Sequence, residues 1–89
     1  MSTWILSKQQ RRVLQLAACG FTNGEIGERI GIQSSTVKNV FTRIYDKLDA
    51  RCRIQAIFTG IALGEISELH AYHYVEARQV ANYLADNKQ

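Results

Sequence analysis

The 89-residue sequence contains no proline, only two cysteines and no apolar run near the roughly 20 residues that a membrane-spanning helix needs. The sequence therefore predicts no membrane association. Strand-type alternation of apolar and polar residues is also scarce. Together with the lack of proline, this favours an all-α fold. Apolar residues make up 46% of the chain, which is typical of a globular domain and too many for a disordered segment.

The few potential metal ligands and nucleophiles do not form a recognisable site. Cys19 and Cys52 show neither a CxxC pair nor metal-ligand spacing. His70 and His73 lie three residues apart without a cysteine or carboxylate to complete a metal set. The opening residues do not form a signal peptide. We expect reduced thiols in a cytoplasmic protein, with no metal, cofactor or small-molecule ligand.

Catalytic patterns are also lacking. The sequence offers no nucleophile–base pair, no clustered pair of acids and no phosphate-binding glycine loop. Three glycines, Gly24, Gly27 and Gly31, lie where helix packing and turning explain them. The sequence therefore indicates a binding or interaction protein and not an enzyme.

Charge is distributed unevenly along the chain. Residues 1–53 carry nine lysines and arginines against four acidic residues, whereas residues 54–89 carry two against four. The net charge of +3 is thus concentrated in the first part. A basic domain is suited to nucleic-acid phosphates, although such a modest excess also serves solubility.

The most informative segment is 23–42. Ile26 and Ile30 give its first part an apolar stripe of helical period, and a second helical pattern begins after almost no linker. Gly27 is small where two helices must cross closely. Gly31 can adopt the positive φ that a sharp turn between helices needs. This pattern is typical of a helix-turn-helix, which binds DNA.

Four helices account for this first part of the chain, and two of them begin with a capping box. Ser7 with Gln10 and Thr22 with Glu25 have the required spacing. The predicted helices cover residues 8–19, 23–30, 34–48 and 54–63.

The predicted third helix has two distinct faces. Val37, Phe41, Ile44 and Leu48 recur at helical spacing and are expected to line the core. Polar residues are expected on the opposite face: Ser35, Lys38, Asn39, Thr42, Arg43 and Asp46.

The predicted fourth helix carries a stripe of small residues at Ala56, Gly60 and Gly64, flanked by Ile57 and Ile61. Small residues let two helices approach closely. The stripe serves either a dimer contact or packing on the protein's own first helix, and the sequence favours neither.

A fifth helix is predicted at about 68–86, capped by Ser67. The segment is acidic and aromatic, which makes it a poor DNA binder and a plausible interface element. We therefore divide the chain into a helix-turn-helix domain, 1–65, and a helical extension, 66–89. Candidate dimer-interface residues are Ile57, Gly60, Ile61, Gly64, Leu69 and Tyr72.

Several short fragments, in order and with matching spacing, resemble the LuxR/GerE-type helix-turn-helix family. The fragments are Leu6-Ser7, Val13-Leu14, Gly20-Phe21-Thr22-Asn23 with Glu25-Ile26, Thr36-Val37-Lys38, Ile44, Lys47-Leu48, Arg53 and Gln55-Ala56. The resemblance covers about 6–64. It implies a four-helix DNA-binding domain that regulates bacterial transcription, with its third helix in the major groove and its fourth helix at a dimer contact.

Some positions depart from the family pattern. Gln10 stands where an acidic residue is usual, and Val40 and Asp49 replace a frequent histidine and a common glycine. Gln33 replaces a serine, from which we expect Ser34 to cap the third helix instead.

We hypothesise that the protein binds double-stranded DNA as a homodimer. Lys38 and Asn39 are expected to project into the groove, Arg43 and Lys47 to contact phosphates or bases, and Thr36 to hold a phosphate at the helix start. The full set of candidate DNA-binding residues is Gln33, Ser34, Ser35, Thr36, Lys38, Asn39, Thr42, Arg43 and Lys47. Lys8, Arg11 and Arg12 are candidates for flanking phosphates.

A second hypothesis is an interaction protein that heterodimerises with a larger LuxR-type regulator and modulates it without reading DNA. The acidic, aromatic fifth helix would then contact the partner. Because no receiver or ligand-binding segment precedes the helix-turn-helix, we expect control through abundance or such a partner.

Overall fold

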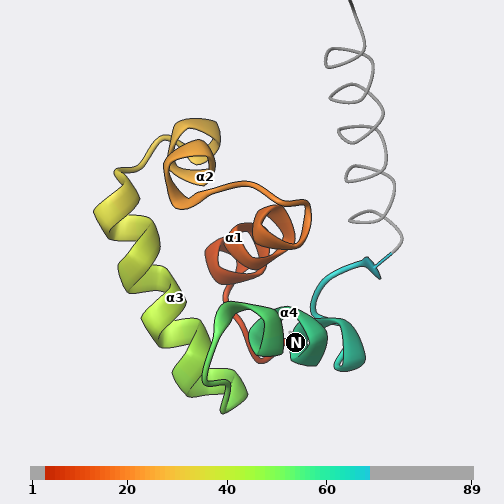
Figure 1. Cartoon of the computed structure of the whole chain (residues 1–89). Helices are drawn as coiled ribbons and strands as arrows, with labels where there is room; N and C mark the ends of the chain where they lie inside the picture. Colours follow the sequence, from red (N-terminus) through yellow and green to blue (C-terminus); the bar gives the residue numbers. More distant parts are fainter. Residues whose placement is uncertain (1–3, 69–89) are drawn as a thin grey trace, which may run out of the picture.

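The computed structural model describes residues 4–68, which form four helices, and confirms the predicted all-α fold (Figure 1). The helices are α1 (Lys8–Ala18), α2 (Asn23–Ile30), α3 (Ser34–Leu48) and α4 (Arg53–Ala62). Each predicted boundary lies within one residue of the observed one. The predicted fifth helix lies outside the described residues, apart from its first position.

Both predicted capping boxes are present. At the start of α1, the Gln10 amide donates to Ser7 Oγ (3.1 Å) and the Ser7 amide donates to Gln10 Oε1 (2.9 Å). The start of α2 repeats this exchange between Thr22 and Glu25, at 3.2 and 3.0 Å. These local bonds satisfy backbone amides that the first helical turn leaves unpaired, which explains why both helices begin where the sequence indicates.

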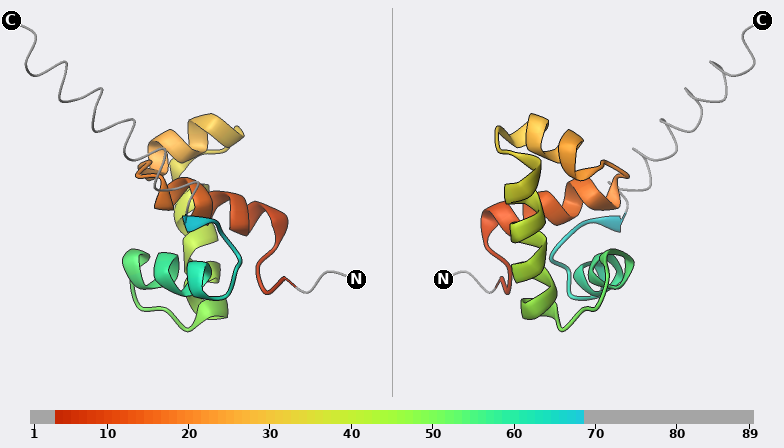
Figure 2. Two further views of the ribbon diagram at one scale, coloured as in Figure 1. Left: turned by 90° about the vertical axis from the view of Figure 1, so that its right-hand side faces the viewer. Right: turned by 60° about the vertical axis from the view of Figure 1, so that its left-hand side comes forward.

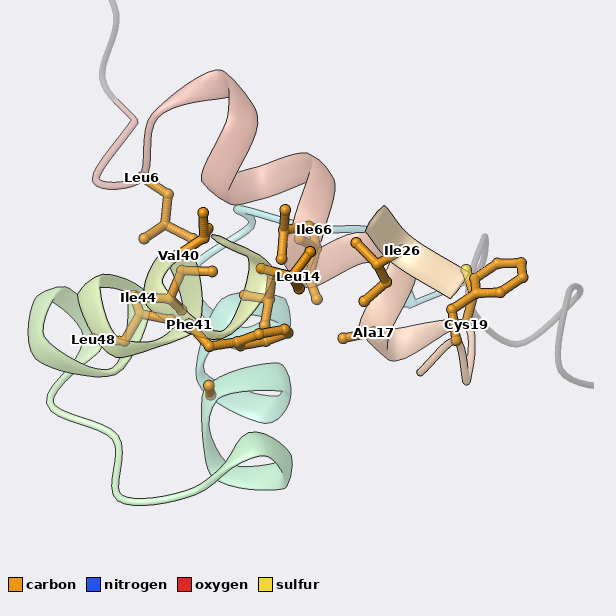
Figure 3. Packing of buried hydrophobic residues seen from close by; sticks show 14 residues of the cluster. Leu6, Leu14, Ala17, Cys19, Ile26, Val40, Phe41, Ile44, Leu48 and Ile66 are labelled. Carbon is orange, nitrogen blue, oxygen red and sulfur yellow. The ribbon is translucent and has the colours of Figure 1, made fainter. Parts of the chain in front are cut away.

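Helix α1 packs against each of the other three helices and lies in the middle of the molecule (Figures 1 and 2). The apolar core extends along it, and Val13 and Leu14 are fully buried there. Figure 3 shows the core as one continuous cluster that receives side chains from every helix. The core thus fixes α3 against α1 and leaves the opposite face of α3 free.

The junction between α2 and α3 depends on two glycines. A Cβ atom at Gly27 would collide with the carbonyl oxygen of Ile32, so the helix and the turn approach backbone to backbone. Gly31 ends α2 in the left-handed conformation, with φ of 78°. Both roles were predicted, and they give the sharp turn of a helix-turn-helix.

The chain after α4 packs back onto α1. Glu65 is buried and accepts a hydrogen bond from the Leu6 amide at 2.6 Å. The side chain of Gln15 exchanges two hydrogen bonds with the backbone of Ser67. Ile66 is part of the core, although we predicted from the sequence that the helical extension begins at this residue. The packed part of the chain therefore reaches beyond residue 65.

Candidate nucleic-acid interface

The two faces of α3 are arranged as the sequence predicts. The core-facing residues Val37, Phe41, Ile44 and Leu48 are buried, together with Val40. The nine candidate DNA-binding residues are all exposed: Gln33, Ser34, Ser35, Thr36, Lys38, Asn39, Thr42, Arg43 and Lys47. The structure therefore brings them together on one helix and its preceding residue, on the side away from the core.

The start of α3 differs from the prediction. Gln33, and not Ser34, occupies the N-cap position, and its side chain makes no capping hydrogen bond. Ser34 already has helical geometry, and a residue inside the first turn cannot cap it. The backbone amides of this turn are consequently not satisfied by a side-chain cap, and helix N-termini in this state attract anions.

Two candidate residues make hydrogen bonds that the sequence did not reveal. Thr42 donates through its hydroxyl to the carbonyl oxygen of Lys38, one turn earlier, at 3.2 Å. Lys47 donates through Nζ to Oε1 of Gln10 on α1, at 2.9 Å. Lys47 is therefore exposed on α3 but reaches α1 with its ammonium group.

Arg53, the first residue of α4, connects three parts of the domain. Its guanidinium donates to Asn23 Oδ1 at 2.7 Å and to the carbonyl oxygen of Phe21, and it stacks over the Phe41 ring at 4.6 Å. Partial burial lowers the pKa of Arg53 from its ordinary value, and the nearby Tyr45 opposes this shift. From the sequence we identified Arg53 only as a position shared with the family, because its hydrogen-bond partners lie about 30 residues away.

Arg53 also lines a depression where the N-termini of α2 and α3 come close together. Thr22, Gly24 and Ser34 line the same depression. The guanidinium and the N-terminus of α3, which has no side-chain cap, favour negative charge here, whereas the Glu25 carboxylate of the capping box offsets the N-terminus of α2. The depression adjoins the start of α3.

Within the described residues, arginine side chains other than that of Arg53 stack on aromatic rings as well. Arg11, a candidate for flanking phosphates, lies over the Trp4 ring at 4.2 Å, and Arg29 lies over Phe21 at 4.1 Å. Lys8 and Arg12 are exposed, on the first half of α1.

Two residues of the small-residue stripe, Ala56 and Gly60, face inward from α4, whereas Gly64 follows the helix and is exposed. Gly60 is buried, and a Cβ atom there would come within 2.7 Å of Leu14 Cδ2 on α1. This is the packing role that the sequence left open. Ile57 and Ile61 are partly buried against the core, and Gly64 ends the helix with φ of 73°.

The outward face of α4 is apolar. Ile54 and Phe58 are 65% and 67% exposed, at i, i+4 spacing on one side of the helix. The sequence reasoning missed them because α4 is apolar on nearly every side, although their spacing was visible. The remaining candidate dimer-interface residues, Leu69 and Tyr72, lie outside the described residues.

Other chemistry is sparse in the part of the chain that the structure describes. Cys19 is buried, which raises the pKa of its thiol, and Cys52 is exposed. Among residues 4–68, no three histidines, cysteines or acidic residues gather where they could share a metal ion. None of the helices in that range combines the length and apolarity needed to cross a bilayer.

Curated relatives of the chain are bacterial regulators. It is 38% identical over 60 residues to the transcriptional regulatory protein DegU of Brevibacillus brevis, covering 67% of this chain and 25% of DegU. It is 47% identical over 51 residues to the transcriptional regulatory protein LiaR of Bacillus subtilis, covering 57% of this chain and 24% of LiaR. The chain thus spans about a quarter of the length of these relatives.

A solved structure of the transcription factor GerE superimposes with a TM-score of 0.71 at 29% identity, covering 73% of this chain and 97% of that one. The GerE family, described as bacterial regulatory proteins of the luxR family, matches residues 4–59. This is a family of DNA-binding regulators and not of enzymes. The exposed face of α3, the glycine junction before it and these similarities lead to one conclusion: the chain belongs to the LuxR family and contains its helix-turn-helix DNA-binding domain.

Proposed function

We propose that the protein is a small bacterial transcription regulator that inserts α3 into the major groove of duplex DNA. The observation that carries this proposal is the exposed polar and basic face of α3, held by a fully packed opposite face. A major groove accepts one α-helix, and the side chains on its outer face read the base edges. Action on DNA in a bacterium also implies a cytoplasmic location.

Within this proposal, the exposed residues have different roles. Lys38 and Asn39 read base edges, because lysine pairs with guanine acceptors and asparagine with adenine. Thr36 and the uncapped amides at the start of α3 hold a phosphate. Arg43 and Lys47 contact phosphates along the helix. The remaining candidates contact the groove or the backbone near these residues: Gln33, Ser34, Ser35 and Thr42.

We further propose that the protein binds as a homodimer through α4. The exposed pair Ile54 and Phe58 forms an apolar surface of the kind that packs against a helix of a second copy. A symmetric pair of domains places two recognition helices about 34 Å apart, one turn of DNA. Phe58→Asp should therefore turn a dimer into a folded monomer in analytical ultracentrifugation, whereas Ile5→Asp, a change at another exposed apolar residue, should leave the dimer intact.

The test of DNA binding is selection from pooled random duplexes across a salt series. Lys38→Ala should weaken binding by at least tenfold and relax base preference at one position. Lys88→Ala removes the same charge outside the helix-turn-helix and should leave base preference unchanged. Weak, unselective binding that Lys38→Ala does not alter would contradict the proposal.

The same apolar face of α4 supports a second candidate function. Ile54 and Phe58 could instead pair with a larger LuxR-type regulator and modulate it, with residues from 69 onward extending the contact. In that case Phe58→Asp abolishes activity and Lys38→Ala leaves it intact. Direct DNA reading predicts the opposite result for Lys38→Ala, so the two variants together separate the functions.

A further inference from the structure

Gln10 links the capping of α1 to a lysine of the recognition helix. Its Oε1 atom accepts two hydrogen bonds, from the Ser7 amide and from Lys47 Nζ, both at 2.9 Å. The Gln10 residue is only 8% exposed, so its position is set by the packing of α1 against α3. Lys47 itself is exposed. A buried, fixed acceptor thus holds the ammonium group of an exposed, flexible side chain.

The chemistry of that acceptor matters because it is neutral. A side-chain amide oxygen orients an ammonium group without cancelling its charge, whereas a carboxylate at the same place would form an ion pair. The capping role of Gln10 does not decide between the two, because glutamate and glutamine serve equally in a capping box. A glutamine at position 10 instead of a glutamate therefore affects the charge beside Lys47 and leaves the capping of α1 unchanged.

Lys47 lies on the part of α3 where that charge is useful. It follows Arg43 by one turn and Thr36 by three, and all three residues are exposed. Phosphates attract fully charged groups, and lysine loses less side-chain freedom on binding when it is already held.

We propose that Gln10 is a positioning residue for DNA binding, which holds Lys47 beside α3 as an uncancelled positive charge for a phosphate. This inference rests on the proposed function, since it assigns one phosphate contact within that interface. It gives α1 a part in DNA binding through a neutral side chain that itself does not touch DNA.

The experiment compares Gln10→Glu with Gln9→Glu in the full chain. Gln9 is the exposed neighbour in the same turn, so both changes add one negative charge at nearly the same place. Gln10→Glu should raise Tm by a few degrees, because it creates an ion pair with Lys47. On a selected duplex, the slope of log K against log salt concentration should also be shallower for Gln10→Glu than for Gln9→Glu by about one. At low salt, Gln10→Glu should bind roughly threefold to tenfold more weakly than Gln9→Glu.

A third variant separates this effect from general repulsion. Lys47→Met alone should reduce the slope of log K against log salt concentration by about one. Adding Gln10→Glu to Lys47→Met should then change binding no more than Gln9→Glu does. If the wild-type protein shows no salt-dependent duplex binding, the proposed function and this inference both fail. If it binds, and the two glutamate variants have equal salt plots, the inference alone is overturned.

Discussion

The two ends of α3 are held in place by different means. At its N-terminal end, the main chain of α2 contacts the main chain of the turn, with Gly27 against the Ile32 carbonyl and Gly31 in the left-handed region. Farther along the helix, side chains make the connections: Arg53 stacks on Phe41 in the middle of α3, and Lys47 near its C-terminal end bonds to Gln10. The N-terminal end of α3 is thus positioned by backbone contacts, and the rest of the helix by side chains, which can adjust.

This difference has a physical consequence for substitutions. Backbone atoms in a packed turn cannot move without shifting both helices, whereas a side chain can change rotamer or bond to water. We therefore expect changes at the α2–α3 junction to be severe and changes at the α3–α4 connection to be graded.

The strongest test of the comparison is Gly27→Ala. The added methyl group would overlap the carbonyl oxygen of Ile32, so α2 and α3 must separate. We expect a loss of about 3 kcal/mol in the free energy of unfolding, measured by urea denaturation. Gly24→Ala is the matched control on the same helix, because its nearest contact is Thr22 Oγ1 at 4.0 Å.

That control should move stability in the opposite direction. Gly24 is exposed within α2, where alanine is favoured over glycine by about 0.8–1.0 kcal/mol. A similar effect of both alanine substitutions would show that helix propensity, and not backbone contact, dominates at this junction.

Farther along α3, Arg53→Met tests the side-chain connections. The variant removes two hydrogen bonds from a charged donor but keeps an apolar group over Phe41, and we expect a loss of about 2 kcal/mol. Arg51→Met, at an exposed arginine two residues earlier, should change stability by less than about 0.5 kcal/mol. Equal effects in thermal denaturation would mean that the bonds to Asn23 and Phe21 add nothing.

Gly31→Ala is expected to have an intermediate effect. No atom lies within 4 Å of its Cβ position, so the penalty arises from the backbone conformation alone. At φ of 78° an alanine should lower stability by about 1–2 kcal/mol. Gly31→Asn should lose less, because asparagine tolerates the left-handed region, and the reverse order in chemical denaturation would argue against backbone strain as the cause.

The sequence predicted well those features that depend on neighbouring residues. Two capping boxes, the ends at Gly31 and Gly64 and the buried stripe of α3 all follow from spacings of a few positions. The prediction that Ser34 caps α3 was wrong, because the position of this cap depends on the main-chain conformation of one residue. Gln33 is the residue that precedes the helix, and Ser34 is already part of it.

Features that join distant residues were not predictable in this way. The bond from Lys47 to Gln10 spans 37 positions, and no local pattern indicates it. The exposed face of α4 was missed for another reason. Ile54 and Phe58 alternate with Ile57 and Ile61, and only the position of α1 decides which pair faces solvent. Gly60 against Leu14 settles that choice.

The last substitution, like Gly24→Ala, is expected to stabilise the protein. Asp49 follows α3 with φ of 53°, the only left-handed residue other than glycine among those described. Its negative charge lies at a helix C-terminus, where the helix dipole disfavours it. Asp49→Gly should therefore stabilise the domain by about 1 kcal/mol, and Asp49→Asn, which removes only the charge, by about half of that. Thermal denaturation at low and high salt separates the two parts, because salt screens the charge term and leaves backbone strain unchanged. If Asp49→Gly destabilised the domain, the side chain of Asp49 would be a required part of the α3–α4 connection, and that end would be less adjustable than its contacts indicate.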